Sequence, residues 1–148
     1  IIRKISQELR PSILDDLGLI AAIDWLKEQY HQRTNIQFTF DIPKEDIDIK
    51  IEYSTAIFRI TQEALTNIMR HADATEVEVN LHLQNSSVFL EIKDNGKGFN
   101  KYKIVSENKS FGIFGMKERV TILGGALNIK SQPNKGTSIN LELPLKSN

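Results

Sequence analysis

Apolar residues recur every three or four positions in three stretches of the chain, which is the spacing of helices that bury one face. The first stretch predicts a helix over residues 15–32, after a break at Pro11, whose ring fixes φ and whose nitrogen carries no hydrogen. The second, over residues 53–71, has the broadest apolar face and predicts the principal helix. A shorter helix is expected from Gly112 to Leu123, because two glycines follow it as a stop signal.

Five other stretches alternate apolar and polar residues, the pattern of strands with one buried face. They predict strands over residues 36–40, 77–83, 88–93, 126–131 and 137–143. The polar run 84–87 joins the second and third strands as a hairpin. The order of elements predicts an α+β fold, a two-layer α/β sandwich with a mixed sheet of about five strands and about three helices. A strict alternation of strand and helix is absent, which argues against a Rossmann or P-loop domain.

The composition fits one soluble globular domain of 148 residues, 40% of them hydrophobic and 26% charged. Nineteen basic and nineteen acidic residues cancel, so the whole chain has no electrostatic attraction to nucleic acid or an anionic membrane, although a local basic patch remains compatible with this balance. We expect no nucleic-acid partner. The lack of cysteine excludes disulfides and thiolate metal sites. No apolar run approaches the roughly 18 residues of a membrane span. The chain begins abruptly in a helical pattern, so we expect a fragment of a longer protein.

The stretch 94–99 (DNGKGF) carries the clearest chemistry. Asp94 closes a predicted strand, and an ionised carboxylate there accepts hydrogen bonds. Gly96 and Gly98 lack the Cβ atoms that would keep a planar ligand from the backbone. The combination suits the amino edge of a purine. Because Asn-Gly is also the commonest two-residue hairpin signal, a tight turn between strands is the structural alternative.

Three further features are compatible with a nucleotide. Glu63 and Asn67, one turn apart on the principal helix, offer oxygen ligands suited to Mg²⁺. Gly112 and Gly115 open a helix whose free amides can receive phosphate. Thr137 places a hydroxyl at the start of a strand, within reach of the same purine. Each feature alone has an ordinary alternative, namely a solvated helix face, turn glycines or a β-forming threonine.

In order and spacing, these motifs resemble the ATP-binding domain of sensor histidine kinases, within the GHKL ATPase superfamily that also holds Hsp90, type II topoisomerases and the mismatch-repair ATPases. The run 62–72 (QEALTNIMRHA) is similar to the family's N box, 94–99 to its G1 box and 112–120 (GIFGMKERV) to its G2 box. Gly136 and Thr137 look like its last glycine box. Upstream, the run 9–19 (LRPSILDDLGL) resembles the end of the second dimerisation helix of NarL/DesK-type kinases.

The resemblance implies a Bergerat-type sandwich, containing a left-handed βαβ unit, that binds ATP and Mg²⁺. Asn67 would ligate the metal, Asp94 would bind the adenine amino group, and Glu63 matches the position thought to orient or deprotonate the acceptor. A lid would form over residues 100–110. The remaining motif positions become candidates for nucleotide contact: Arg70, His71, Gly96, Gly98, Phe99, Gly112, Ile113, Gly115, Met116 and Thr137.

The implied function is that of a catalytic domain of a two-component sensor kinase, which transfers the γ-phosphoryl of Mg-ATP to a histidine outside this sequence. Its implied partners are the phosphoacceptor histidine of a dimerisation domain, a response regulator and a second copy of the parent protein. Residues 1–33 would be the end of the dimerisation region with a connecting helix, and residues 34–148 the ATP-binding domain. The domain would lie in the cytoplasm, whether or not the parent is anchored in a membrane.

Two alternatives use the same nucleotide site. One is a gyrase-like or MutL-like ATPase module, in which binding drives dimerisation. The other is a serine kinase of the anti-sigma type. The run 9–19 favours the sensor kinase over the ATPase module.

Overall fold

Five strands form one mixed sheet in the computed structural model, which describes residues 11–98 and 112–145. They are β1 (Gln37–Asp41), β2 (Glu76–Gln84), β3 (Ser87–Asp94), β4 (Ala126–Ser131) and β5 (Thr137–Pro144). Their order across the sheet is β1-β2-β3-β5-β4. β1 runs parallel to β2, and the other neighbouring pairs are antiparallel. The predicted mixed sheet is confirmed, with β1 one residue further along the chain than expected.

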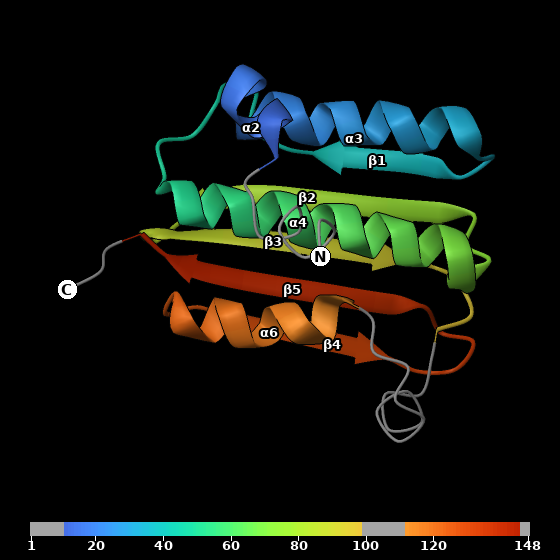
Figure 1. The fold of residues 1–148 in the computed structure, drawn as a ribbon. Coiled ribbons are helices and arrows are strands. Elements are labelled where there is room, and N and C mark those ends of the chain that lie inside the picture. Colours follow the sequence, from blue (N-terminus) through green and yellow to red (C-terminus); the bar gives the residue numbers. More distant parts are fainter. Residues whose placement is uncertain (1–10, 99–111, 146–148) are drawn as a thin grey trace, which may run out of the picture.

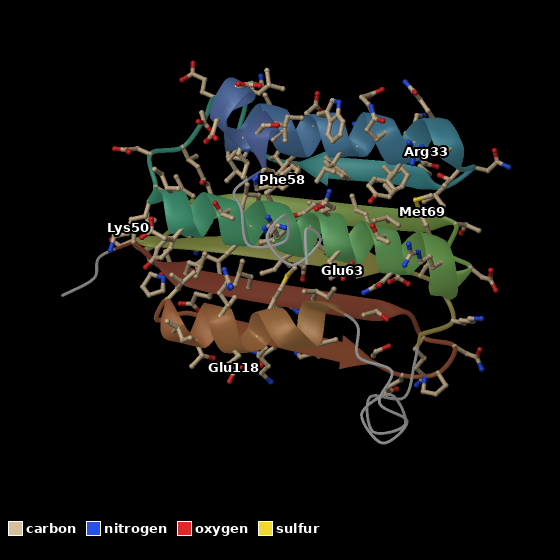
Figure 2. The ribbon with its side chains drawn as sticks, in the orientation of Figure 1. Arg33, Lys50, Phe58, Glu63, Met69 and Glu118 are labelled. Atoms are coloured by element: carbon tan, nitrogen blue, oxygen red, sulfur yellow. The ribbon has the colours of Figure 1, made fainter. Side chains whose placement is uncertain are left out.

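Helices cover one face of this sheet, so the described residues form two layers as predicted (Figure 1). They are α2 (Ser12–Leu17), α3 (Leu19–Arg33), α4 (Ile51–Asn67) and α6 (Gly112–Ile122). The three long helices correspond to the three predicted helices, with differences at their ends, and the six-residue α2 is an addition to the prediction. Glu118 lies exposed on the side of α6 that points away from α4 (Figure 2).

Apolar side chains from both layers form one core. Phe58 of α4 is 1% exposed, and full burial of such a side chain stabilises the fold by about 1.5–3 kcal/mol. The facing strand positions are equally buried, whereas their neighbours on the strands are polar and exposed, as Glu78 and Lys93 are. Leu14 of α2 and Leu26 of α3 belong to the same core, so the first two described helices pack as part of this sandwich.

The helix predicted over residues 15–32 is wrong at its start. α2 ends at Leu17 and α3 begins at Leu19, with Gly18 between them at φ +82°. Asp46 caps α3, because its Oδ1 accepts hydrogen bonds from the amides of Leu19 at 3.1 Å and Ile20 at 3.3 Å. A Cβ on Gly18 would lie 2.6 Å from Asp46 Oδ2. Hydrophobic spacing could not reveal this boundary, because the capping carboxylate lies in a distant loop.

The principal helix begins two residues earlier than predicted, and its end changes character. After Asn67 the chain makes a π-helical turn over Ile68–Ala72, and Asp73 then adopts the left-handed conformation at φ +51°. Wider turns of this kind are frequent at functional sites. Because α4 ends at Asn67 and the π-helical turn begins at Ile68, Asn67 lies at the junction between the two kinds of backbone.

The hairpin between β2 and β3 is confirmed, since Gln84 pairs with Ser87 and the two residues between them have positive φ. The hairpin alternative for Asn95-Gly96 is excluded. Both edges of β3 are already occupied, by β2 and by β5. The stretch after β3 is therefore a loop at the end of the sheet.

Candidate nucleotide site

Four segments that carry the sequence motifs meet at one end of the sandwich (Figure 1). They are the C-terminal end of α4, the end of β3, the start of β5 and the start of α6. Asp94 pairs with Thr137 in the register of β3 and β5, so two motifs that are distant in sequence are direct neighbours. The Thr137 hydroxyl also makes a hydrogen bond of 2.8 Å with Ser131 Oγ.

Asp94 is half-buried, and one of its oxygens is held in place. Its Oδ1 accepts a hydrogen bond of 2.8 Å from the amide of Gly96. Burial raises the pKa of the Asp94 carboxyl above its usual value, while the backbone amides of Gly96 and Thr137 lower it in part. The carboxylate is therefore oriented but incompletely solvated. A ligand with a hydrogen-bond donor would give the Asp94 carboxylate a further partner.

Two glycines allow backbone segments to touch beside this carboxylate. Gly136 has φ +79°, and a Cβ there would collide with the carbonyl oxygen of Asp94. Gly98 has φ +64°, and a Cβ there would collide with the carbonyl oxygen of Gln132. Gly98 is thus required for packing of the loop, in addition to the room for a ligand that the sequence suggests.

Asn95, which the sequence motifs do not single out, anchors the stretch 94–98. Its Oδ1 accepts hydrogen bonds from the amides of Thr75 at 2.9 Å and Glu76 at 3.0 Å, and its Nδ2 donates to Thr75 Oγ1 at 2.8 Å. Lys97 adds an exposed ion pair with Asp73 at 3.8 Å, a kind of contact that contributes little. No local pattern in the sequence indicates this role, because the partners Thr75 and Glu76 lie 20 and 19 residues away from Asn95. The loop is held in shape by the protein itself.

The polar side of α4 leads into the same end of the molecule. Glu63 and Asn67 are half-buried and Arg70 is exposed. No three His, Cys, Asp or Glu side chains gather as metal ligands within residues 11–98 and 112–145. Mg²⁺ is commonly bound by one or two protein oxygens together with phosphate and water oxygens, and an amide oxygen at Asn67 fits that pattern.

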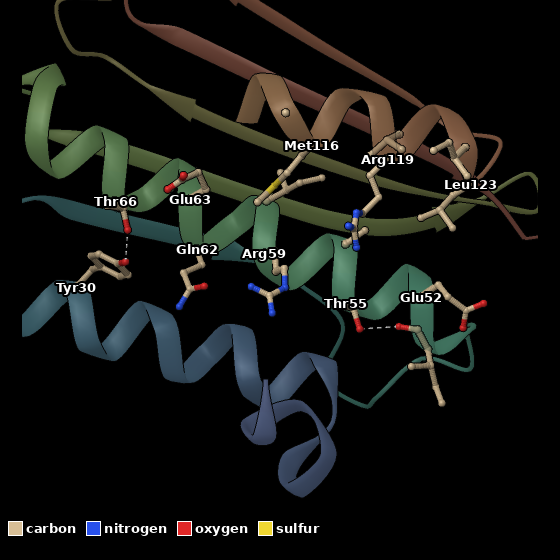
Figure 3. A pocket seen from close by; sticks show the side chains of 16 residues that line it. Tyr30, Glu52, Thr55, Arg59, Gln62, Glu63, Thr66, Met116, Arg119 and Leu123 are labelled. Atoms are coloured by element: carbon tan, nitrogen blue, oxygen red, sulfur yellow. Dashed lines mark hydrogen bonds between the residues drawn. The ribbon is translucent and has the colours of Figure 1, made fainter. Parts of the chain in front are cut away.

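A groove of about 860 Å³ runs along the outer side of α4, between α3 and α6 (Figure 3). Glu63 and Met116 line it towards the end of α4, and Arg59 and Arg119 line it further back. Burial, and then repulsion by the Arg119 guanidinium, lower the pKa of Arg59. Both guanidinium groups therefore contribute positive charge to this part of the groove.

Two residues of α6 that were predicted to contact the nucleotide, Gly115 and Met116, belong to the described part of the chain. Gly115 is exposed, and no atom of the described part of the chain lies within 4 Å of a Cβ built there. Met116 faces α4 across the groove (Figure 3). Gly112 and Ile113 lie in the first turn of α6, and His71 lies in the π-helical turn. Other predictions fall outside the described residues or side chains, namely those for the side chains of His71 and Ile113, for Phe99 and for the lid over residues 100–110.

Comparison with known proteins assigns the fold and the motifs to one family. Residues 52–147 match the family described as histidine kinase-, DNA gyrase B- and HSP90-like ATPase. The chain belongs to this ATPase family. The predicted relationship is therefore confirmed, and with it a domain type that binds ATP.

Relatives of this ATPase domain are named as sensor kinases. The signal transduction histidine-protein kinase/phosphatase DegS of Bacillus subtilis is 40% identical over 140 residues, which cover 92% of this chain and 36% of DegS. The oxygen sensor histidine kinase NreB of Staphylococcus carnosus is 38% identical over 146 residues, which cover 97% of this chain and 41% of NreB. The ATPase domain thus spans less than half the length of these relatives, and it groups with the histidine kinase branch.

Solved structures share the fold of the ATPase domain. The histidine kinase domain of a blue-light activated histidine kinase from Erythrobacter litoralis has a TM-score of 0.69 at 20% identity, covering 86% of this chain and 59% of that chain. The histidine kinase AdeS of Acinetobacter baumannii has a TM-score of 0.67 at 11% identity, covering 92% of this chain and 74% of that chain. The predicted α+β sandwich is confirmed.

Proposed function

We propose that this ATPase domain transfers the γ-phosphoryl group of Mg-ATP to a histidine that another segment of its parent protein presents. The observation that carries the proposal is the half-buried, oriented carboxylate of Asp94 at the same end of the sandwich as Asn67. One group suits the amino edge of adenine and the other suits a metal on the phosphates. Together they would define both ends of a bound nucleotide.

The proposed binding roles follow from the chemistry of each group. Asp94 accepts hydrogen bonds from the adenine amino group, while the loop over residues 94–98, which Asn95 holds in shape, supports the base. Thr137, paired with Asp94, adds a hydroxyl. Asn67 would hold Mg²⁺, which neutralises charge on the phosphates when bound. Phosphate contacts fall to Arg70, His71 and the first turn of α6, whose amides lack intrahelical partners.

Glu63 is the candidate for orienting or deprotonating the acceptor. It lines the groove that runs along α4 between α3 and α6, whereas Asp94 does not. We propose that the acceptor segment enters along this groove, so that its histidine meets the phosphate end of the nucleotide. Phosphoryl transfer depends mainly on positioning and charge neutralisation, so Glu63 needs no strongly perturbed basicity.

The remaining partners come from the same proposal. A response regulator would take the phosphoryl group from the acceptor histidine, and the parent would act as a homodimer. None of the described helices is both long and apolar enough to cross a membrane. We place the domain in the cytoplasm, where ATP is available.

Titration calorimetry with Mg-ATP, followed by transfer from radiolabelled ATP to an added dimerisation segment, tests the proposal. Glu63→Gln should lower transfer about 10- to 100-fold with little loss of ATP affinity, since it removes an acceptor-side group. Glu118→Gln, on the far side of α6, is the matched control and should leave transfer unchanged. Label on a serine of a partner protein would contradict histidine transfer and favour the anti-sigma type of kinase. Dimerisation driven by ATP without any label would favour the gyrase-like module.

A further inference from the structure

One side-chain hydrogen bond joins α3 to the site end of α4. The hydroxyls of Tyr30 and Thr66 lie 2.7 Å apart, and both residues are half-buried (Figure 3). Tyrosine and threonine hydroxyls each donate and accept, so the bond forms with either one as the donor. The two residues stand 36 positions apart in the sequence. The bond is a specific polar link between two helices that both contribute to the apolar core.

Thr66 occupies a central place among the proposed functional positions of α4. Asn67 follows it directly, and Glu63 precedes it by almost one turn. Glu63, Thr66 and Tyr30 line the same end of the groove (Figure 3). A rotation of α4 about its axis at Thr66 would therefore move Glu63 and Asn67 together.

The backbone of α4 loses its regular geometry directly after this point. The amide of Ile68 is shared between the carbonyls of Ala64 and Leu65, and the π-helical turn over Ile68–Ala72 follows. A helix end whose hydrogen-bond ladder changes register is less constrained by its own backbone. The hydrogen bond between Tyr30 of α3 and Thr66 restrains this end of α4 from outside the helix.

We propose that Tyr30 is a positioning residue for phosphoryl transfer. Through Thr66 it fixes the orientation of the last α-helical turn of α4, and so the placement of Glu63 and Asn67 relative to Asp94. The inference rests on the proposed function for the roles of Glu63 and Asn67, but the link between the helices stands on its own geometry. It also makes the site sensitive to movement of α3, whose first turn is held separately by Asp46.

The test compares Tyr30→Phe and Thr66→Val with a control at the other end of α4. The single Tyr53 hydroxyl proton is shared between the carbonyl oxygens of Pro144 at 2.8 Å and Leu123 at 3.3 Å, so Tyr53→Phe removes a comparable hydroxyl contact from a tyrosine of α4 itself. Transfer from Mg-ATP to an added dimerisation segment gives kcat and KM for each variant. Hydrogen exchange of residues 66–72 reports the end of α4 without any need for activity.

Tyr30→Phe and Thr66→Val should each lower kcat about 5- to 20-fold, because a small misplacement of reacting groups is costly. The double variant should be no worse than either single variant, since both remove one bond. Thr66→Ser keeps the hydroxyl and should restore most of the rate. Tyr53→Phe should change kcat less than about 2-fold, even where thermal unfolding shows equal destabilisation.

Equal losses of kcat in the Tyr30 and Tyr53 variants would overturn the positioning role and leave a general stabilising one. So would a Thr66→Ser protein as slow as Thr66→Val. Faster exchange confined to residues 66–72 in Tyr30→Phe supports the link, whereas no change there refutes it. A wild-type chain that neither binds Mg-ATP nor transfers label would defeat the proposed function, and the exchange measurement would still decide on the link.

Discussion

At the scale of single residues, Asp94 is an ionisable group in surroundings that resist its charge. Its half-buried position raises the pKa of the carboxyl, and the Gly96 amide fixes one of its oxygens. A charge held under such conditions binds a complementary donor more strongly than an exposed charge does. The same conditions make the charge unfavourable for the fold when no ligand is bound.

Asp94→Asn should weaken ATP binding about 10- to 100-fold, because the amide replaces an ionised acceptor and can turn a donor towards the adenine amino group. The substitution should leave the free energy of unfolding unchanged or slightly higher, since it removes a partly desolvated charge. Calorimetry and chemical denaturation measure the two effects. Asp41→Asn, at the exposed end of β1, is the control and should affect neither. Equal ATP affinity in wild type and Asp94→Asn would contradict the assignment.

The raised pKa of Asp94 also predicts a pH dependence. Protonation begins at a higher pH than for an ordinary aspartate, so ATP affinity should fall as the pH falls through that pKa. The ligand-free fold responds in the opposite sense, because the native state binds this proton more tightly than the unfolded chain does. The contribution of Asp94 to the free energy of unfolding is therefore most favourable at low pH and is lost as the pH rises through the raised pKa. Titration calorimetry with Mg-ATP over a descending pH series should show ATP affinity falling with pH in the wild type and not in Asp94→Asn. The same dependence of ATP affinity on pH in both proteins would refute the role of Asp94 in this dependence.

Asn67→Ala should impair the Mg²⁺ dependence of ATP binding while costing the fold less than about 1 kcal/mol, because Asn67 is a half-buried polar residue at a helix end. Titrations of ATP at several Mg²⁺ concentrations measure the effect. Gln62→Ala, a half-buried polar change on the same helix, serves as the control. An unchanged Mg²⁺ dependence in Asn67→Ala would remove this residue from the proposed metal site.

At the scale of elements, the junction of β3 and β5 depends on Gly136. Gly136→Ala combines the strain of a positive φ with a collision against the carbonyl of Asp94, and should cost about 2–5 kcal/mol along with ATP binding. Gly124→Ala, after α6, has φ +86° and open space around its Cβ, so it should cost only the conformational term of about 1–2 kcal/mol. Denaturant unfolding of both variants separates the collision from the strain. Equal destabilisation would show that the close approach of the strands is unimportant.

The elements that could be predicted are those with a local signal. Alternation located the five strands, and the positive φ values of Asn85 and Ser86 fit the polar loop that predicted the hairpin. The break at Gly18 depends on Asp46, which lies 27 residues from Leu19, so spacing could not reveal it. The π-helical turn after Asn67 has no pattern of its own, because apolar spacing continues through it.

The candidate site was predictable only where motifs carry chemistry. Asp94 and Thr137 are candidates from the sequence because a carboxylate and a hydroxyl stand at the ends of predicted strands, and Asn67 is one because its amide lies one helical turn from Glu63. Asn95 and Tyr30 could not, since their importance lies in which distant residues they contact. Pairing of Asp94 with Thr137 also needed the strand order, which the sequence alone does not provide.

At the scale of the whole molecule, the chain should bind ATP without labelling itself stably. His82 stacks on Phe89 with ring centroids 5.5 Å apart on the exposed face of the sheet, and His31 packs edge-on against Phe38 at 6.3 Å near the end of α3. Neither position belongs to the groove beside Glu63. Incubation with radiolabelled ATP should give no acid-labile phosphate on this chain. Addition of a dimerisation segment with an acceptor histidine should give label on that segment. Acid-labile phosphate on any of the chain's own three histidines would refute this.

The strand order also has a consequence for biosynthesis. β4 emerges from the ribosome before β5, yet its neighbour in the sheet is β5, and β5 is also the strand that covers the second edge of β3. Until β5 has been made, β3 therefore keeps an unpaired edge, the kind of surface through which incomplete chains associate. About fifty residues separate the end of β3 from the end of β5, which corresponds to roughly 2.5–10 s of synthesis. The sheet and the Asp94–Thr137 pair of the nucleotide site can therefore form only after β5 has been synthesised.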